Sequence, residues 1–467
     1  MSGAGAAGAA GGAGGAGGPG LARRLGVFDA TMIVMGGIIG AGIFRNPSEV
    51  ARHVGTPPLM LGAWVVGGLV ALAGAFVYAE LAQRRPEVGG QYAYIRDAFH
   101  PMAAFLYGWT LLLVTQTGGM AAVAMTFADY FRELTGLNIE RSLIAVVTLG
   151  TLTVINCLGV RSGSNVQSTL MVMKIAAILM LVIVGWRAVQ GSAAWGVGSP
   201  KTTHPSPQTA FLAAMVPVLF AYGGWQTASF VSAEMRNPER DLPRGLLLGV
   251  LGVVVLYLAV NVVCIFALGP GRLADTQTPA SEVMRLAVGE GGAKLIAAGI
   301  AISTVGFLSQ GMLTAPRVYY AMARDGVFFR RVGTLSDKSR APVIAITLQG
   351  IWACVIAVVG LYAQVLNYVV ALDAVFFGLT GAALLVFRKR DPAAVKGMRM
   401  PGHPITTIIF VLAFWTLALS TIIQFPKDAG MGVLILLLGV PIYLFWRTRG
   451  SSRAPSSGDT TKKSDRL

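Results

Sequence analysis

Charged residues are scarce in this chain: aspartate, glutamate, lysine and arginine make up 12% of its 467 residues, while 54% are hydrophobic. Soluble domains carry about a quarter charged residues, so this composition excludes an ordinary soluble enzyme or binding domain. The uncharged runs are about twenty residues long, enough to cross a bilayer core of roughly 30 Å as helices. The alternating short segments of a membrane β-barrel are missing. The sequence therefore predicts an all-α membrane protein.

Other absences narrow the class of function. The three cysteines and four histidines do not have the spacing of metal ligands, so we expect no metal site and no cofactor. The chain lacks the Gly-x-x-x-x-Gly-Lys-Ser/Thr motif of ATP-driven proteins and any convergent catalytic set, which argues against an enzyme. Repeated pore loops and an attached signalling domain are also missing, which disfavours a channel and a receptor. A carrier driven by a gradient or by exchange remains.

The apolar runs predict twelve transmembrane helices, at 27–46, 59–82, 103–131, 142–160, 167–189, 209–235, 245–269, 292–323, 342–361, 365–387, 404–423 and 430–446. With the N-terminus inside, the inner side receives 25 lysines and arginines against 10 outside. The positive-inside rule then places both termini in the cytoplasm of a multi-pass protein of the cell (inner) membrane. The net charge of +16 is explained by this placement, and we expect no nucleic-acid partner.

Two spans contain helix breakers near their centres. The first has four glycines among residues 36–42, and the sixth has Pro217 followed by Gly223 and Gly224. Close helix packing explains Gly36 and Gly40 as well as a break does. The breaks lie five spans apart, however, at matching positions of two halves, which is typical of transporters built from inverted repeats.

A pair of broken helices creates a binding site from backbone alone. The half-helix after a break begins with free amides and partial positive charge, which attract a carboxylate. The half-helix before it ends with free carbonyls, which attract an ammonium group. A zwitterionic amino acid offers both charges, so the sequence predicts an amino acid as substrate.

The motifs around the breaks resemble those of the amino acid–polyamine–organocation transporter superfamily, particularly its L-type branch. Gly-Ala-Gly-Ile-Phe at 40–44 resembles the family's Gly-Ser-Gly-Ile-Phe, and residues 220–226 resemble Phe-Ala-Tyr-Gly-Gly-Trp-Asn. Further matches are Tyr78-Ala79-Glu80-Leu81, Gly89-Gly90-Gln91-Tyr92-Ala93-Tyr94, and Glu234 with Asn237, Pro238 and Pro243.

The resemblance implies a LeuT-type fold: a five-plus-five inverted repeat with helices 1 and 6 broken and two extra helices. The repeats would be 25–190 and 208–388, with the extra spans at 404–447. Residues 1–24 are rich in glycine and alanine, and residues 448–467 are polar. Both are expected to be disordered cytoplasmic tails.

The resemblance also implies site residues. Amides of Ala41 and Gly42 would hold the substrate carboxylate, carbonyls near Ile38, Phe220 and Gly223 its amino group, and Phe220 would be the gate. The full expected substrate-binding set is Ile38, Gly40, Ala41, Gly42, Ile43, Phe220, Ala221, Tyr222, Gly223 and Gln226. Ala41 replaces the family's usual serine and Gln226 replaces the branch's asparagine, so the branch's side-chain preference does not carry over.

Two ionisable residues within spans are candidates for coupling. Lys174 could snorkel toward the cytoplasm, but in several family members a lysine here fills the space of a sodium ion, which implies sodium-independent transport. Asp373 could relay protons, contact a cationic substrate or simply line an outer vestibule. The charges of Asp29, Glu80 and Arg317, near inner helix ends, are expected to act as gates or to anchor loops.

The expected function is secondary transport of amino acids by alternating access, coupled to protons or working as an exchanger, as a monomer or homodimer. A polyamine or other organic cation is the alternative substrate. The loop at 132–141 has no cysteine, where animal members join an accessory glycoprotein by a disulfide, so no such subunit is expected. The stretch 84–101 is expected to form an interfacial helix.

Overall fold

The computed structural model describes residues 23–190, 206–359, 362–392, 395, 397–424 and 426–451. Within these ranges the secondary structure is helical, apart from one isolated parallel bridge between Leu25 and Met235. The all-α prediction is therefore confirmed for the described part of the chain. The tail expected from residue 448 begins inside the last helix, which ends at Ser451, and residues 1–22 and 452–467 lie outside the described residues.

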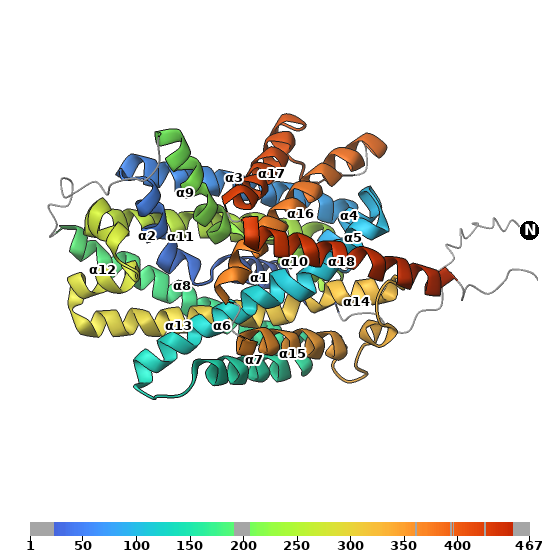
Figure 1. The fold of residues 1–467 in the computed structure, drawn as a ribbon, viewed down its shortest axis with the longest axis horizontal. Helices are drawn as coiled ribbons and strands as arrows, with labels where there is room; N and C mark the ends of the chain where they lie inside the picture. Colours follow the sequence, from blue (N-terminus) through green and yellow to red (C-terminus); the bar gives the residue numbers. More distant parts are fainter. Residues whose placement is uncertain are drawn as a thin grey trace, which may run out of the picture.

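The helices are arranged as a bundle of long, roughly aligned rods, seen from the side in Figure 1. In chain order they are α1 (Val27–Ile38), α2 (Gly42–His53), α3 (Pro57–Arg84), α4 (Gln91–Ala98), α5 (Pro101–Thr110), the π-helix η1 (Leu111–Thr115), α6 (Gln116–Thr135), α7 (Arg141–Cys157), α8 (Val160–Gln190), α9 (Pro207–Tyr222), α10 (Thr227–Phe230), the 3₁₀ turn η3 (Ser232–Glu234), α11 (Pro238–Asp275), α12 (Pro279–Val288), α13 (Glu290–Thr314), α14 (Pro316–Arg324), the 3₁₀ turn η4 (Arg330–Gly333), α15 (Val343–Val359), α16 (Tyr362–Arg390), α17 (Ile405–Gln424) and α18 (Pro426–Ser451).

Nine helical stretches among the described residues are long and apolar enough to cross a membrane, or ten when the bent pair α1 and α2 counts as one span. Two further apolar helices, α7 and α15, have 17 residues each. At 1.5 Å per residue each is about 25 Å long, slightly shorter than a bilayer core. They pack against each other along the lower edge of Figure 1. By length and composition the described residues contain nine or ten spans, and adding this pair gives twelve.

The long helix α11 holds α1 in the middle of the bundle. The two helices meet through glycines: a Cβ added at Gly245 would lie 2.4 Å from the Cβ of Ala30, and one at Gly249 would lie 2.6 Å from Cγ1 of Val34. Such small faces let two transmembrane backbones approach closely. This close approach fixes the position of α1 along α11. It therefore also fixes the position of the chain break that follows Ile38.

The loops predicted to lie inside the cell gather at one end of the bundle, the right-hand end of Figure 1. Leu25 pairs with Met235, Arg96 forms an ion pair with Asp325 at 2.8 Å, and the rings of Phe329 and Trp446 lie 5.0 Å apart. Three pairs of segments that are far apart in the sequence therefore meet at this end.

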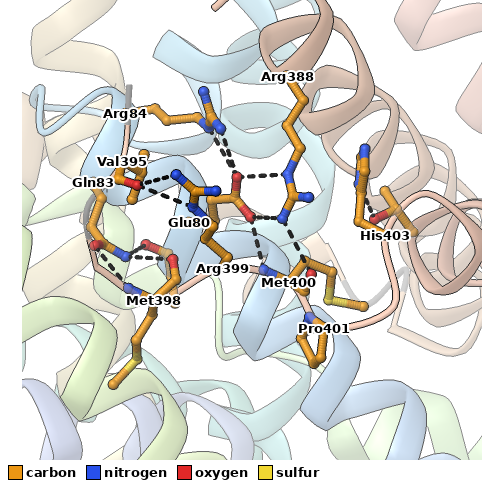
Figure 2. A network of polar contacts seen from close by, with 12 residues as sticks. Glu80, Gln83, Arg84, Arg388, Val395, Met398, Arg399, Met400, Pro401 and His403 are labelled. Atoms are coloured by element: carbon orange, nitrogen blue, oxygen red, sulfur yellow. Dashed lines mark hydrogen bonds and ion pairs between the residues drawn. The ribbon is translucent and has the colours of Figure 1, made fainter. Parts of the chain in front are cut away.

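Glu80 anchors this end. Its buried carboxylate accepts hydrogen bonds from Arg84 at 2.8 and 3.1 Å, from Arg388 at 2.6 and 2.9 Å, and from the amide of Met400 at 2.8 Å (Figure 2). Gln83 holds the same loop through two hydrogen bonds with the Met398 backbone. The contacts join the ends of α3 and α16 to the loop before α17, which is the loop-anchoring role expected for Glu80.

The expected interfacial helix at 84–101 is wrong in its placement. The helix exists as α4, but Tyr92, Tyr94 and Ile95 are fully buried, and they pack into the protein instead of lying in the headgroup layer. The polar residues between them suggested a surface face, yet Arg96 forms ion pairs with Glu87, Asp97 and Asp325. These carboxylates raise the pKa of Arg96 despite its partial burial.

Candidate functional site

The first break separates α1 from α2 by three residues, Ile39 to Ala41, and the axis bends by 42° there. The carbonyls before and within the break have lost their helical partners and are met by side chains from three other helices. The Ile38 carbonyl accepts a hydrogen bond from the Tyr257 hydroxyl at 3.2 Å, and the Gly40 carbonyl accepts one from the Ser303 hydroxyl at 3.3 Å. Between them, the Ile39 carbonyl accepts from the Lys174 ammonium. The break is therefore held in a defined shape by α8, α11 and α13.

The start of α2 supplies the opposite polarity. The amides of Gly42 and Ile43 lie in its first turn, where a helix offers no internal acceptor. Ala41 and Gly42 are half-buried, whereas Gly40 and Ile43 are buried. Ala41 and Gly42, the two positions predicted to bind a carboxylate, are therefore the partly exposed residues at the start of α2.

The second interruption lies between α9 and α10, at residues 223–226. Gly224 has φ +114°, and a Cβ added there would lie 2.0 Å from the carbonyl oxygen of Gly37 in α1. A Cβ added at Gly37 would in turn lie 2.6 Å from the carbonyl oxygen of Gly224. The two interrupted segments thus touch backbone to backbone, which only glycines allow.

Tyr257 connects the two breaks. Its buried hydroxyl lies 3.2 Å from the carbonyl oxygen of Ile38 and 3.2 Å from that of Ala221. Each carbonyl has a second lone pair that can accept from a bound ammonium group. The Phe220 carbonyl accepts from the amide of Gly223 at 3.2 Å. The negative ends of α1 and α9 are therefore brought to one place by a side chain of α11.

The remaining predicted residues around the second interruption differ in how far their side chains are exposed. Ala221, Tyr222 and Gln226 are buried, Gly223 is half-buried, and Phe220 is 42% exposed. Tyr222 donates to the carbonyl of Trp64 at 3.2 Å, so its hydroxyl serves packing. The Oε1 atom of Gln226 is buried with no hydrogen-bond partner among the described residues. Phe220, the predicted gate, is therefore the most exposed of these residues.

Lys174 does not snorkel. Its side chain is completely buried between α1 and α13, its ammonium donates to the Ile39 carbonyl, and a Cβ added at Gly306 would lie 3.3 Å from its Cε. No carboxylate pairs with it in the part of the chain that the structure describes. The Lys174 side chain therefore ends at a backbone carbonyl of the first break.

Asp373 lies on α16, half-buried, and does not pair with Lys174. The Thr115 hydroxyl at the end of η1 faces its carboxylate, and the hydroxyls of Tyr78 and Tyr107 lie within electrostatic range. A π-helix within a longer helix often marks a functional position, because the extra residue widens the turn. The two coupling candidates therefore belong to different polar surroundings.

Sequence reasoning missed three residues that shape the site: Tyr257, Ser303 and Gln310. Gln310 donates to Thr227 at 2.5 Å and so fixes the start of α10 beside the second interruption. Each is a polar side chain in the middle of a long apolar helix, and this is the only feature of the sequence that could have identified it. Their partners are backbone atoms or residues far along the chain, and no local pattern predicts those.

The loop-rich end of the bundle is closed by contacts between the segments before α1 and after α10. Leu25 is fully buried against Met235, with the amide of Arg236 donating to the Leu25 carbonyl at 2.8 Å. Deeper inside, Arg317 and Glu234 form a buried ion pair at 2.6 Å. Leu25 and the Arg317–Glu234 pair are therefore buried near this end of the bundle, whereas Phe220 is exposed.

Comparison with known proteins agrees with this architecture. The sequence profile of the amino acid permease family matches residues 25–444. The human large neutral amino acids transporter small subunit 2 is 30% identical over 91% of this chain and 81% of its own length. The serine/threonine exchanger SteT of Bacillus subtilis is 28% identical over 93% and 99%, and the mouse Asc-type amino acid transporter 1 is 28% identical over 92% and 82%.

The fold is similar to that of a solved Na⁺-coupled sialic acid symporter in a substrate-bound outward-open state. The TM-score is 0.55 at 12% identity, covering 85% of this chain and 90% of that one. This likeness concerns the fold alone. The family profile and the relatives confirm the resemblance in the motifs: the chain belongs to the amino acid permease family of the amino acid–polyamine–organocation superfamily, in its L-type branch.

Proposed function

We propose that this protein is a sodium-independent secondary transporter that moves amino acids by alternating access, coupled to protons or working by exchange. The observation that carries the proposal is the contact between the two interruptions, where Gly37 meets Gly224. It brings the amide end of α2 and the carbonyl ends of α1 and α9 together. A carboxylate is attracted to the first and an ammonium group to the second, and an α-amino acid carries both groups.

The substrate class follows from this backbone site. The carboxylate would accept from the amides of Ala41 and Gly42, and the ammonium group would donate to the carbonyls of Ile38, Ala221 and Gly223. Phe220 would close over the bound molecule. The similarity to an exchanger and to two amino acid transporters supports both the substrate class and exchange.

We propose the wider architecture on the same grounds: twelve transmembrane helices in a LeuT-type five-plus-five repeat, 25–190 and 208–388, with two extra helices in 404–447. The two interruptions would be the broken helices 1 and 6. The gathering of basic loops at one end supports cytoplasmic termini in the cell membrane. No disulfide-linked subunit is expected, and the protein would work as a monomer or homodimer.

Lys174 is proposed to replace a coupling sodium ion. Replacing it by methionine keeps an unbranched side chain, one atom shorter, but removes the charge and leaves the Ile39 carbonyl without its donor. The loss of a hydrogen bond from a charged group costs about 1.5–3 kcal/mol, so substrate affinity should fall roughly 10- to 150-fold. Scintillation proximity binding of a labelled substrate measures this, with exposed Lys294→Met as the control. Unchanged binding and pH response in Lys174→Met would refute the role.

Tyr257 is proposed to set the relative position of the two carbonyl ends. Tyr257→Phe removes one buried hydroxyl and should raise KM about 5- to 30-fold, because a hydrogen bond shared by both breaks is lost. Initial uptake rates over a range of substrate concentrations give KM separately from the maximal rate. Tyr319→Phe is the matched control, since that buried hydroxyl has no partner among the described residues. Equal effects of both substitutions would contradict the bridging role.

Asp373 supports a second candidate, transport of a polyamine or another organic cation. A half-buried carboxylate beside Thr115 could accept a positive side chain or a proton. A single acid does not by itself favour a polycation over an amino acid with a cationic side chain. We therefore place Asp373 as a coupling or selectivity residue and keep the polyamine as the alternative.

Uptake into proteoliposomes tests the proposed function. A panel of labelled amino acids and polyamines is offered with and without internal amino acid, with and without a pH gradient, and with sodium replaced by choline. We expect saturable amino acid uptake that internal substrate or a pH gradient accelerates and that choline leaves unchanged. Sodium dependence would contradict the role of Lys174, and uptake of polyamines alone would favour the alternative. Uptake that does not saturate would exclude a carrier.

A further inference from the structure

We propose that five exposed arginines at the closed end of the bundle bind the headgroup of an anionic phospholipid. They are Arg23, Arg24, Arg236, Arg240 and Arg244, and together they form what we call the arginine site. The site is separate from the substrate pocket and does not depend on which molecule the protein transports.

Backbone pairing gathers the arginine site from two distant parts of the chain. The amide of Arg24 donates to the Glu234 carbonyl at 2.9 Å, and that of Arg236 donates to the Leu25 carbonyl at 2.8 Å. The pairing places Arg23 and Arg24 alongside Arg236. Arg240 and Arg244 follow on successive turns of α11, so the five residues share one end of α1 and α11.

The arginine site keeps its positive charge. None of its guanidinium groups forms an ion pair or hydrogen bond with another residue of the described chain. The nearby acids are engaged elsewhere: Glu234 pairs with Arg317, Asp29 accepts from Ser164 at 3.0 Å, and Asp241 is buried near the Asn237 amide. Glu239 is the one exposed carboxylate among the described neighbours in this stretch.

The depth of the site in the membrane points to a lipid. Arg240, Arg244 and Leu248 are four residues apart on α11 and all exposed, and the exposed apolar face continues to Leu251 and Val255. An exposed apolar face on a transmembrane helix lies against acyl chains. Arginines at the end of that face are at headgroup level, where a cluster of four to eight basic residues attracts anionic lipids. A phospholipid offers an anionic headgroup to the arginines and acyl chains to the apolar face, whereas a free anion can bind only the arginines.

Binding of the full-length protein to phosphatidylglycerol, compared with phosphatidylcholine, tests the proposal, with titration in detergent followed by native mass spectrometry. Each arginine near an anionic surface contributes roughly fivefold to affinity. The variant R236Q/R240Q/R244Q should therefore lose at least tenfold in phosphatidylglycerol affinity and nothing for phosphatidylcholine. The single variant Arg240→Gln should lose about fivefold in phosphatidylglycerol affinity. It tests the proposal if the triple variant does not fold.

The matched control is R330Q/R331Q/R447Q, which removes the same number of exposed charges from the same end of the bundle. It should lose less than threefold. Equal losses in both triple variants would overturn the proposal, because general surface charge would then explain the binding. Equal affinity of the unchanged protein for phosphatidylcholine would also overturn it. Displacement of phosphatidylglycerol by millimolar inorganic phosphate would assign the site to a free anion instead.

Discussion

Replacing Gly224 by alanine is expected to lower amino acid transport by at least about 30-fold. At φ +114° a side chain is strained, and its Cβ would lie 2.0 Å from the carbonyl oxygen of Gly37. Left-handed backbone costs an ordinary residue about 1–2 kcal/mol before that collision is counted, so the two interrupted segments must separate. The backbone amides and carbonyls proposed to bind the substrate then lose their alignment. Uptake into proteoliposomes measures the loss, after size-exclusion chromatography has shown that the variant is folded.

Substitutions at two other glycines distinguish this effect from a general disruption of helices. A methyl group at Gly150, on α7, meets nothing within 4 Å, so Gly150→Ala should transport like the unchanged protein. At Gly223 φ is −64° and the nearest atom lies 3.4 Å from an added Cβ, so Gly223→Ala should lose less than Gly224→Ala. Normal transport by Gly224→Ala would refute the contact between the interruptions as the basis of the site.

Replacing Glu80 by alanine is expected to lower the free energy of unfolding by about 3–5 kcal/mol. Its carboxylate accepts from Arg84, Arg388 and the Met400 amide while fully buried. Removing one member of a buried ion pair leaves uncompensated charge in the interior, and here two guanidinium groups would be left together. The end of α16 and the loop before α17 should then detach from α3. Thermal unfolding in detergent, followed by intrinsic fluorescence, measures the loss.

Glu87 provides the comparison for Glu80. It also pairs with an arginine, Arg96 at 2.7 Å, but its side chain is 49% exposed. Exposed pairs contribute about 0–1 kcal/mol, so Glu87→Ala should shift the unfolding midpoint only slightly. Equal shifts for the two variants would mean that burial does not decide the strength of the Glu80 network.

The class of fold could be predicted from the sequence because a bilayer imposes one simple demand. Every backbone amide and carbonyl in lipid must be satisfied within the protein, so long uncharged runs become helices. The same demand makes glycines and prolines at the centre of a span conspicuous, which is why Gly37, Gly40, Pro217 and Gly224 marked the right region. The spans at α7 and α15 are short, and length alone does not decide whether each crosses the membrane.

The partners of polar side chains could not be predicted. The sequence allows Lys174 either to snorkel or to stay in the interior, and its contact with Ile39 shows that it stays inside the protein. The apolar side of α4 is expected at the membrane interface, but Tyr92, Tyr94 and Ile95 are buried against other parts of the chain. Tyr257 gave no sign that its hydroxyl reaches Ile38 and Ala221 together.

The sequence by itself determined a helical membrane protein with helix breakers in two spans and an excess of basic residues in alternate loops. Those features follow from local composition, since hydrophobic length, glycine flexibility and loop charge act within a few residues. Only the tertiary structure decided that Gly37 and Gly224 touch, that Tyr257 and Lys174 hold the carbonyls beside the breaks, and that Arg24 lies beside Arg236. Each is a contact between residues far apart in the chain, fixed by how the helices pack against one another.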